Sequence, residues 1–362
     1  MPLKRTAFFT IHQRLGAKIV EFAGYEMPVQ YTGIIEEHRR VRDAVGVFDV
    51  SHMGEVEIAG SDALAFVQSI TVNDASKLFE GRVQYSAMCY DDGGIVDDLL
   101  VYHMGDQYML VINAANIDKD IAWMQQHVSG DVKIRNRTDD ISLLAVQGPR
   151  SQAVLQKLTA ADLSKIGYYH FTRHALAGVD MIISRTGYTG ELGYELYFPA
   201  EASLAERVWK AVMDAGKDCG IGPVGLGARD TLRLEMGYCL YGHDIDQTTH
   251  PLEAGLGWIT KLDKGNFIGR DAIMKAKSSG LRRRLVGFTL GGNAFPRQGY
   301  EIAASGTGIG HVTSGTFSPT LQKGIGMGYV MTGHAAPGSA FDIRIREKIV
   351  PAAVVPLPFV KK

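Results

Sequence analysis

Two adjacent aspartates lie in an apolar stretch that has the pattern of a β-strand. Asp97 and Asp98 stand in IVDDLLVY, residues 95–102, directly after a Gly-Gly turn. Side chains alternate between the two faces of a strand, so the carboxylates point to opposite, mostly apolar faces. At least one is expected in poorly solvated space, where a charge needs a partner or a raised pKa. The alternative is that the strand begins after the aspartates, which then only cap the hairpin.

A glycine-rich segment, RTGYTGELGYELYF at 185–198, contains a third candidate carboxylate, Glu195. Its glycines allow the backbone to turn sharply or to approach a ligand closely. A carboxylate accepts two parallel N–H bonds from a flat heterocycle with an amidine-like edge, such as a pterin or a guanine. The alternative is an edge-strand glutamate that faces water, which is the commoner position for this residue type.

A helix pattern at 225–237, GLGARDTLRLEMG, carries a cluster of charges. In a helix, Arg229, Arg233 and Met236 lie near one face, where Arg229 is in position to pair with a buried carboxylate or a ligand oxygen. Taken without context, the charges of this segment favour a solvated helix face instead.

Several common chemistries lack their sequence signatures. No Cys-x-x-Cys or His-Glu-x-x-His pattern occurs, and the eleven histidines are scattered, so no metal site is expected. No Gly-x-Ser-x-Gly elbow, phosphate loop or helix-opening Gly-x-Gly-x-x-Gly is present. The sequence therefore gives no support for a serine hydrolase or a nucleotide-binding enzyme of these types.

Apolar periodicity and turn residues place the candidates on strands and helices of a mixed α and β region. Glycine-containing turns at 91–94 and 105–106 separate three strand patterns and predict a β-meander. Strand patterns occur at 83–90, 95–104, 107–113, 174–184 and 193–199, and helix patterns at 34–45, 117–128, 203–216 and 225–237. Gly46 is expected to cap the first helix at its end, and Asn116 to cap the second at its start.

The secondary-structure pattern of the sequence changes near residues 278–280. The remaining sequence has no helix pattern and consists of short apolar segments separated by turn signals. This pattern predicts a small all-β domain, a barrel or a sandwich, over 280–362. The first 275 residues or so are expected to form an α+β region of two interleaved domains, one of which includes about 52–137.

The composition sets limits on location and partners. Of 362 residues, 46% are hydrophobic, and 38 Lys and Arg balance 39 Asp and Glu, so a disordered chain and a general nucleic-acid binder are both disfavoured. No apolar run reaches the length of about 18–20 residues that spans a bilayer, and no secretory signal is evident. Three separated cysteines fit a reducing compartment, so a cytoplasmic location is expected.

Six motifs in fixed order resemble one protein family over nearly the whole chain. They are FDVSHMGEVEIAG, GGIVDDLLVY, LLAVQGP, RTGYTGELGYE, GLGARDTLRLEMGYCLYGHDID and VTSGTFSPTL. The family is that of the glycine cleavage T-proteins, which are aminomethyltransferases. The resemblance implies an α+β fold with three domains around a central cavity for tetrahydrofolate, including an all-β C-terminal barrel.

The resemblance also implies a reaction and its partners. The family takes an aminomethyl group from the dihydrolipoyl arm of the H-protein, releases ammonia and forms 5,10-methylenetetrahydrofolate, with no metal. By match to the family motifs, the essential aspartate is Asp97. The positions matched to folate binding are Glu195 and Arg229 and, from less distinctive motifs, Met53, Tyr85, Asn113 and Tyr188.

Alternatives to this function use the same scaffold. One is a demethylase of sulfonium or methylamine compounds, and another is a folate-binding accessory protein of iron–sulfur cluster maintenance. Relatives of the accessory type carry a cysteine in the loop that reads RTGYTGELGYE here. Because H-proteins are acidic, the basic run 282–284 is one candidate docking site, and a solvated strand start is the alternative.

Overall fold

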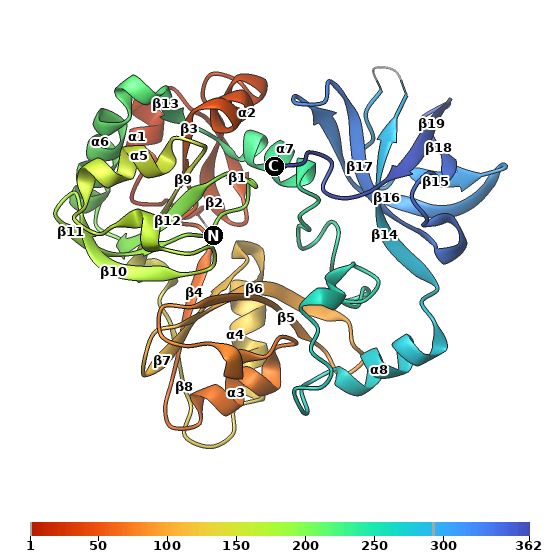
Figure 1. Ribbon diagram of the computed structural model, residues 1–362, viewed down its shortest axis with the longest axis horizontal. Helices are drawn as coiled ribbons and strands as arrows, with labels where there is room; N and C mark the ends of the chain where they lie inside the picture. Colours follow the sequence, from red (N-terminus) through yellow and green to blue (C-terminus); the bar gives the residue numbers. More distant parts are fainter. Residues whose placement is uncertain (1, 292–293) are drawn as a thin grey trace. The chain divides into compact units, whose positions relative to one another are not determined.

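The computed structural model describes residues 2–291 and 294–362 and divides the chain into two compact units (Figure 1). Unit 1 comprises Met1–Val67, Ala75–Gln84 and Leu99–Asp230, and unit 2 comprises Gln68–Asp74, Tyr85–Asp98 and Thr231–Lys362. The boundary expected at 275–280 lies inside unit 2, between α8 (Arg270–Ser279) and the barrel. Among the described residues, no helix has the length and apolarity required to span a membrane.

A six-stranded sheet forms the larger part of unit 1. Its strand order is β10-β11-β12-β9-β3-β13, and only the β13–β3 pair is parallel. The strands are β3 (Val45–Asp49), β9 (Ile141–Gln147), β10 (Phe171–Leu176), β11 (Val179–Ser184), β12 (Gly193–Pro199) and β13 (Ile221–Pro223). The packed helices are α1 (Phe9–Arg14), α2 (Ile34–Asp43), α5 (Ser151–Leu155) and α6 (Ala202–Ala215). Buried side chains such as Phe8, Leu144 and Trp209 make up its core.

The predicted meander is confirmed as part of a five-stranded sheet of order β5-β6-β7-β4-β8. Its strands are β4 (Gly54–Ala59), β5 (Val83–Cys89), β6 (Ile95–His103), β7 (Gln107–Ile112) and β8 (Lys133–Asn136). The helices of this region are α3 (Ala63–Ile70) and α4 (Ile117–Gln126), and β1 (Lys18–Phe22) and β2 (Tyr25–Gln30) form a separate two-stranded sheet. Both β5 and β6 contribute residues to each unit.

Two helix-end predictions are wrong. The first helix ends at Asp43, and Gly46 lies within β3, where an added Cβ would stand 2.4 Å from Val41 Cγ2. This glycine is required by close packing and not by a helix cap. Among the described residues, the Asn116 side chain makes no capping hydrogen bond to α4, and it is buried instead.

The C-terminal all-β prediction is confirmed as a closed six-stranded barrel in unit 2. Its order is β14-β17-β16-β15-β18-β19. The strands are β14 (Arg283–Leu290), β15 (Glu301–Ala304), β16 (Thr307–Ser318), β17 (Lys323–Met331), β18 (Ala340–Ile345) and β19 (Lys348–Val355). Phe288, Ile302 and Val330 are fully buried in its core.

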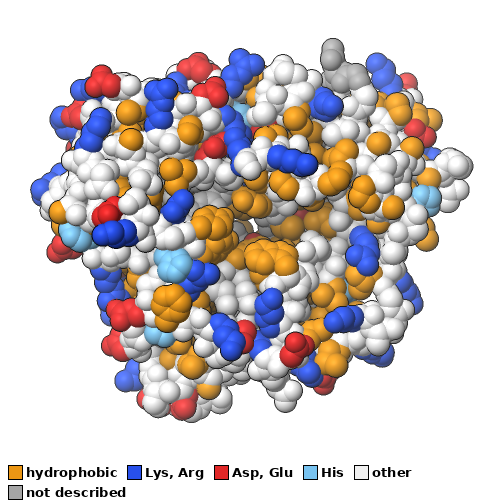
Figure 2. Space-filling view, in the orientation of Figure 1, with side chains coloured by type: hydrophobic (Ala, Val, Ile, Leu, Met, Phe, Trp, Pro, Cys, Tyr) orange, Lys and Arg blue, Asp and Glu red, His pale blue; other side chains and the backbone are white. Residues whose placement is uncertain are grey.

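Side chains of both charges are distributed over the face that Figure 2 shows, in keeping with the balanced composition.

A buried ion pair ties the end of α7 (Leu226–Glu235) to the barrel within unit 2. Arg233 is 1% exposed, and its Nη1 donates to Asp244 Oδ2 at 2.6 Å. Asp244 also accepts hydrogen bonds from Thr313 and Ser314 on β16. Glu235 is buried as well and accepts from Ser318. The solvated-face interpretation of this segment is therefore wrong at its C-terminal end.

Removal of one partner of this ion pair should destabilise the protein strongly. Asp244→Ala leaves the Arg233 guanidinium buried without its countercharge, so the free energy of unfolding should fall by about 3–5 kcal/mol. Arg344→Ala is the control, because its pair with Glu301 is solvent-exposed and is worth about 1 kcal/mol or less. Denaturant unfolding measures both, and equal losses in the two variants would contradict the assignment.

Candidate functional site

Glu195 lies in the interior of a sheet. It is on β12, between Ser184 of β11 and Ala145 of β9, so the edge-strand alternative is wrong. The Thr186 hydroxyl makes a short hydrogen bond to Glu195 Oε2, and the Tyr197 hydroxyl donates to the same oxygen at 3.5 Å. Burial of the carboxyl group raises its pKa, and the contact with Thr186 and the charge of Arg229 act against that shift.

A network of buried hydroxyls supports this carboxylate. Tyr102 Oη is 2.9 Å from Tyr197 Oη, donates to Ser184 Oγ at 3.1 Å and lies 3.3 Å from Thr186 Oγ1. Burial raises the pKa of both tyrosines, so their hydroxyls keep their protons. Protonated hydroxyls are donors, and this network therefore favours a negative charge on Glu195.

Arg229 brings a positive charge to the same region of unit 1. Its guanidinium carbon lies 4.7 Å from the centroid of the Tyr188 ring, a cation–π contact. Burial and the charge of Arg229 together lower the pKa of His52 to about 3, so His52 is neutral at physiological pH. The Glu37 carboxylate fixes the start of α7 by accepting from the Gly225 backbone N–H at 2.8 Å.

The loop between β11 and β12 is shaped by a single glutamine. Gln147 donates to the Thr186 carbonyl at 3.2 Å and accepts from the Thr189 hydroxyl at 2.9 Å. A Cβ on Gly187 or Gly193 would lie 2.1 or 2.3 Å from atoms of this side chain. These glycines are therefore needed because the Gln147 side chain occupies the adjacent space.

An ion pair holds the far side of the same loop. Arg42 on α2 donates from Nη1 to the Thr189 carbonyl at 2.6 Å and to Glu191 Oε1 at 2.9 Å. Both side chains are buried to more than nine-tenths. With Gln147, this pair fixes the backbone on both sides of Tyr188.

The paired aspartates lie inside β6 and belong to unit 2, so the alternative that they precede the strand is wrong. Asp97 is fully buried, and the more exposed Asp98 accepts a hydrogen bond from the Tyr85 hydroxyl at 2.9 Å. The Tyr85 ring lies 6.0 Å from that of Trp258. The start of β6 is anchored by the Tyr241 hydroxyl, which donates to the Ile95 carbonyl at 3.0 Å.

Met53 and Asn113 flank two paired strands, β4 and β7, at the same end of the five-stranded sheet. Gly54 of β4 pairs with Ile112 of β7, so Met53 and Asn113, each one residue outside its strand, lie at the same end of the sheet. Both residues are partly exposed. Glu195, Arg229, Tyr188, Met53 and Asn113 thus belong to unit 1, and Tyr85 and Asp97 belong to unit 2.

Glu55 is a buried carboxyl group that sequence reasoning missed. In β4, Glu55 and Glu57 alternate with apolar residues, which is typical of a half-exposed strand. Glu57 fits that pattern and pairs with Arg137 at 3.1 Å, whereas the Glu55 side chain is fully buried. The sequence carries no signal that separates the two glutamates.

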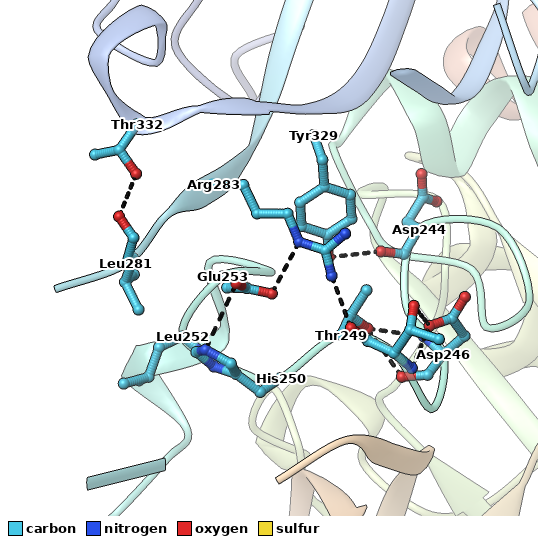
Figure 3. Close-up of polar contacts among 11 residues, drawn as sticks. Asp244, Asp246, Thr249, His250, Leu252, Glu253, Leu281, Arg283, Tyr329 and Thr332 are labelled. Atoms are coloured by element: carbon cyan, nitrogen blue, oxygen red, sulfur yellow. Dashed lines mark hydrogen bonds and ion pairs between the residues drawn. The ribbon is translucent and has the colours of Figure 1, made fainter. Parts of the chain in front are cut away.

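The basic run at 282–284 is divided by its strand geometry. Arg283 donates to Glu253 Oε2 at 3.1 Å and to the Thr248 carbonyl at 2.7 Å, and it stacks on the Tyr329 ring at 4.7 Å (Figure 3). Arg282 and Arg284 are exposed.

Within residues 2–291 and 294–362, no group of three or more His, Cys, Asp or Glu side chains is arranged to hold a metal ion.

Family models and known proteins match the chain over nearly its full length. The GCVT N-terminal domain matches residues 8–264, and the glycine cleavage T-protein C-terminal barrel domain matches 283–361. An aminomethyltransferase of Halothermothrix orenii is 53% identical over 359 residues, which cover 99% of this chain and 100% of that protein. One of Chloroherpeton thalassium is 56% identical over 363 residues and 99% of both proteins.

A solved structure agrees with these relatives. The glycine cleavage system aminomethyltransferase T from Bartonella henselae superposes with a TM-score of 0.92 at 32% identity. The match covers 99% of this chain and 98% of that one.

The contact between Gln147 and Gly193 predicts an energetic coupling. Gly193→Ala places a methyl group against the Gln147 side chain and should lower the free energy of unfolding by about 1–3 kcal/mol. In a Gln147→Ala background the same substitution should cost much less, because the obstructing side chain is gone. A double-mutant cycle by denaturant unfolding measures this, and additive effects would show that the contact does not constrain the loop.

Proposed function

Since the chain belongs to the glycine cleavage T-protein family, we propose that Glu195 and its neighbours in unit 1 bind the pterin of tetrahydrofolate. The chain is an aminomethyltransferase of the glycine cleavage system. It takes the aminomethyl group from the dihydrolipoyl arm of the H-protein, releases ammonia and forms 5,10-methylenetetrahydrofolate. Tetrahydrofolate is thus a substrate of the reaction.

The hydrogen bonds of Glu195 support its role in pterin recognition. A carboxylate offers about four lone-pair sites. The hydroxyls of Thr186 and Tyr197 both bind Oε2 and occupy two of them. The open sites are on Oε1, which is left to accept from an N–H group of a 2-amino-4-oxopterin edge, and a protonated side chain would recognise that edge less well.

Aromatic and amide groups complete the proposed folate site. The Tyr188 ring has one face toward the Arg229 guanidinium, and the loop contacts of Gln147 and Arg42 hold it there. We assign Tyr188 and Tyr85 as flat walls for the ligand and Met53 as an apolar contact. Asn113, next to Met53 at the end of the sheet, is assigned as a polar contact.

Asp97 is the residue that we assign to the chemical step. The reaction expels ammonia from a carbon bound to sulfur and passes that carbon to a folate nitrogen. A buried carboxylate serves this step by orienting the nitrogen, accepting its proton or stabilising an iminium-like cation. The full burial of the Asp97 side chain supports this role, because a charge acts most strongly where water is excluded.

The reaction requires a partner protein. The lipoylated H-protein is a transient partner and an acidic one, and Arg282 and Arg284 are the exposed cations of the basic run. Arg283 is engaged with Glu253 and is left out of this surface.

Three free cysteines support a reducing, cytoplasmic location.

Neutralising Asp97 should stop the reaction without preventing folate binding. Asp97→Asn keeps the shape of the side chain and removes its charge, so turnover should fall by about a hundred- to ten-thousand-fold. Ammonia release from loaded H-protein measures turnover, and calorimetry with tetrahydrofolate measures binding. Wild-type ammonia release by this variant would remove Asp97 from the chemical step.

Truncating Glu195 should weaken folate binding. Glu195→Ala removes a charged acceptor of ligand N–H groups, worth about 1.5–3 kcal/mol, so the dissociation constant should rise by roughly 10- to 150-fold. Because burial raises the pKa of Glu195, wild-type affinity should fall as the pH decreases through that raised value. Unchanged calorimetric affinity in the variant would exclude Glu195 from the pterin site.

A further inference from the structure

The Thr186 hydroxyl gives its only proton to Glu195. Thr186 lies just after β11, and its hydroxyl makes the short hydrogen bond to Glu195 Oε2. The carboxylate takes this proton because a charged acceptor binds it more strongly than a neutral hydroxyl does. Thr186 Oγ1 is also 3.0 Å from Ser184 Oγ. In that contact Ser184 is therefore the donor.

Tyr102 sets the direction of the contact between Ser184 and Thr186. It lies on β6 of the five-stranded sheet, and its hydroxyl donates to Ser184 Oγ at 3.1 Å. A serine that accepts this proton keeps its own proton for Thr186. Without the Tyr102 hydroxyl, Ser184 is free to turn and to accept from Thr186. The Thr186 proton is then shared between Ser184 and Glu195.

Tyr102 also contacts the second hydroxyl that binds Glu195. Its Oη is 2.9 Å from Tyr197 Oη, and the Tyr197 hydroxyl reaches Glu195 Oε2 at 3.5 Å. Both donors to Oε2 thus have Tyr102 as a neighbour, since its Oη is 3.3 Å from Thr186 Oγ1 as well. Tyr102 is fully buried, whereas Glu195 is partly exposed, so the hydroxyls act on the carboxylate from its buried side.

The ring of Tyr102 is held independently of its hydroxyl. The ring centroid lies 5.5 Å from that of Phe171 and 5.6 Å from that of Tyr197. A phenylalanine at position 102 retains both ring contacts and loses only the hydroxyl. The chain therefore offers a substitution that separates the donor from the packing.

We propose that Tyr102 is a positioning residue for Glu195: through the hydroxyls of Thr186 and Tyr197 it ties Oε2 to the protein and leaves Oε1 to the pterin. The proposal rests on the proposed pterin-binding role of Glu195. Burial raises the pKa of Glu195, and the hydrogen bonds from Thr186 and Tyr197 act against that shift, so the same contacts that orient the carboxylate favour its charge.

Loss of the Tyr102 hydroxyl should make Glu195 easier to protonate. Glu195 then keeps its charge over a narrower pH range, and the fall in tetrahydrofolate affinity at low pH should begin at a higher pH. The loss is equivalent to about one neutral hydrogen bond. The titration midpoint of Glu195 should therefore rise by about half to one pH unit, and affinity below it should fall roughly three- to tenfold.

Tyr102→Phe tests the proposal in the ligand-free protein. Infrared spectroscopy follows the conversion of carboxylate to carboxylic acid with pH, and the signal missing from Glu195→Gln identifies Glu195. Its midpoint should rise in Tyr102→Phe. Tyr194→Phe is the matched control, because it removes a buried hydroxyl from the same strand as Glu195 that binds the Leu163 carbonyl at 3.0 Å. Its midpoint should be that of the wild type.

Thr186 supplies a second pair of variants. Thr186→Val removes the hydroxyl at nearly constant shape, and the midpoint of Glu195 should rise by about one to two pH units, because a hydrogen bond to a charged group is lost. Thr186→Ser keeps the hydroxyl and should restore the wild-type midpoint. If Tyr102→Phe does not fold, a wild-type midpoint in Thr186→Val would overturn the proposal, since Tyr102 acts through this hydroxyl.

Calorimetry with tetrahydrofolate extends the test to the ligand. The decline in affinity at low pH should move to higher pH in Tyr102→Phe and stay in place in Tyr194→Phe; the ionisation of the ligand is the same in each titration and cancels. A wild-type midpoint in Tyr102→Phe, or an equal rise in Tyr194→Phe, would overturn the proposal. Failure of the pterin assignment is a different result, namely unchanged tetrahydrofolate affinity in Glu195→Gln.

Discussion

A single negative charge held in a poorly solvated place is the constraint on which the unit 1 site depends. Burial opposes the ionisation of Glu195, and the hydroxyls of Thr186 and Tyr197 together with the Arg229 charge favour it. Burial also keeps the side chains of His52 and Glu55 neutral. Glu195 then carries a negative charge in the same region as the Arg229 cation, and a carboxylate suits the donor edge of a pterin.

The surrounding structure serves to keep these groups in place. Gln147 and the Arg42–Glu191 pair fix the loop that carries Tyr188, and Glu37 fixes the start of the helix that carries Arg229. Each contact uses a buried polar group, which is stable only when its hydrogen bonds are made. In unit 2, the Arg233–Asp244 pair has the same function for the end of α7 and the barrel.

The elements were more predictable from sequence than the environments of individual side chains. The turn residues at 91–94 and the short apolar segments after residue 280 are local signals, and they predicted the meander and the barrel. Gly46 and Arg233 depend on packing partners distant in the chain, Val224 and Ser314, so local patterns misassigned them. Glu55 and Glu57 have the same local pattern, and only the fold decides that one is buried and the other meets Arg137.

The most direct test of the central claim is a crystal structure of the protein with bound tetrahydrofolate. The 2-amino and N3 groups of the pterin should lie about 2.7–3.2 Å from the Glu195 carboxylate oxygens. A pterin ring bound elsewhere, with the Glu195 carboxylate hydrated by solvent, would contradict it.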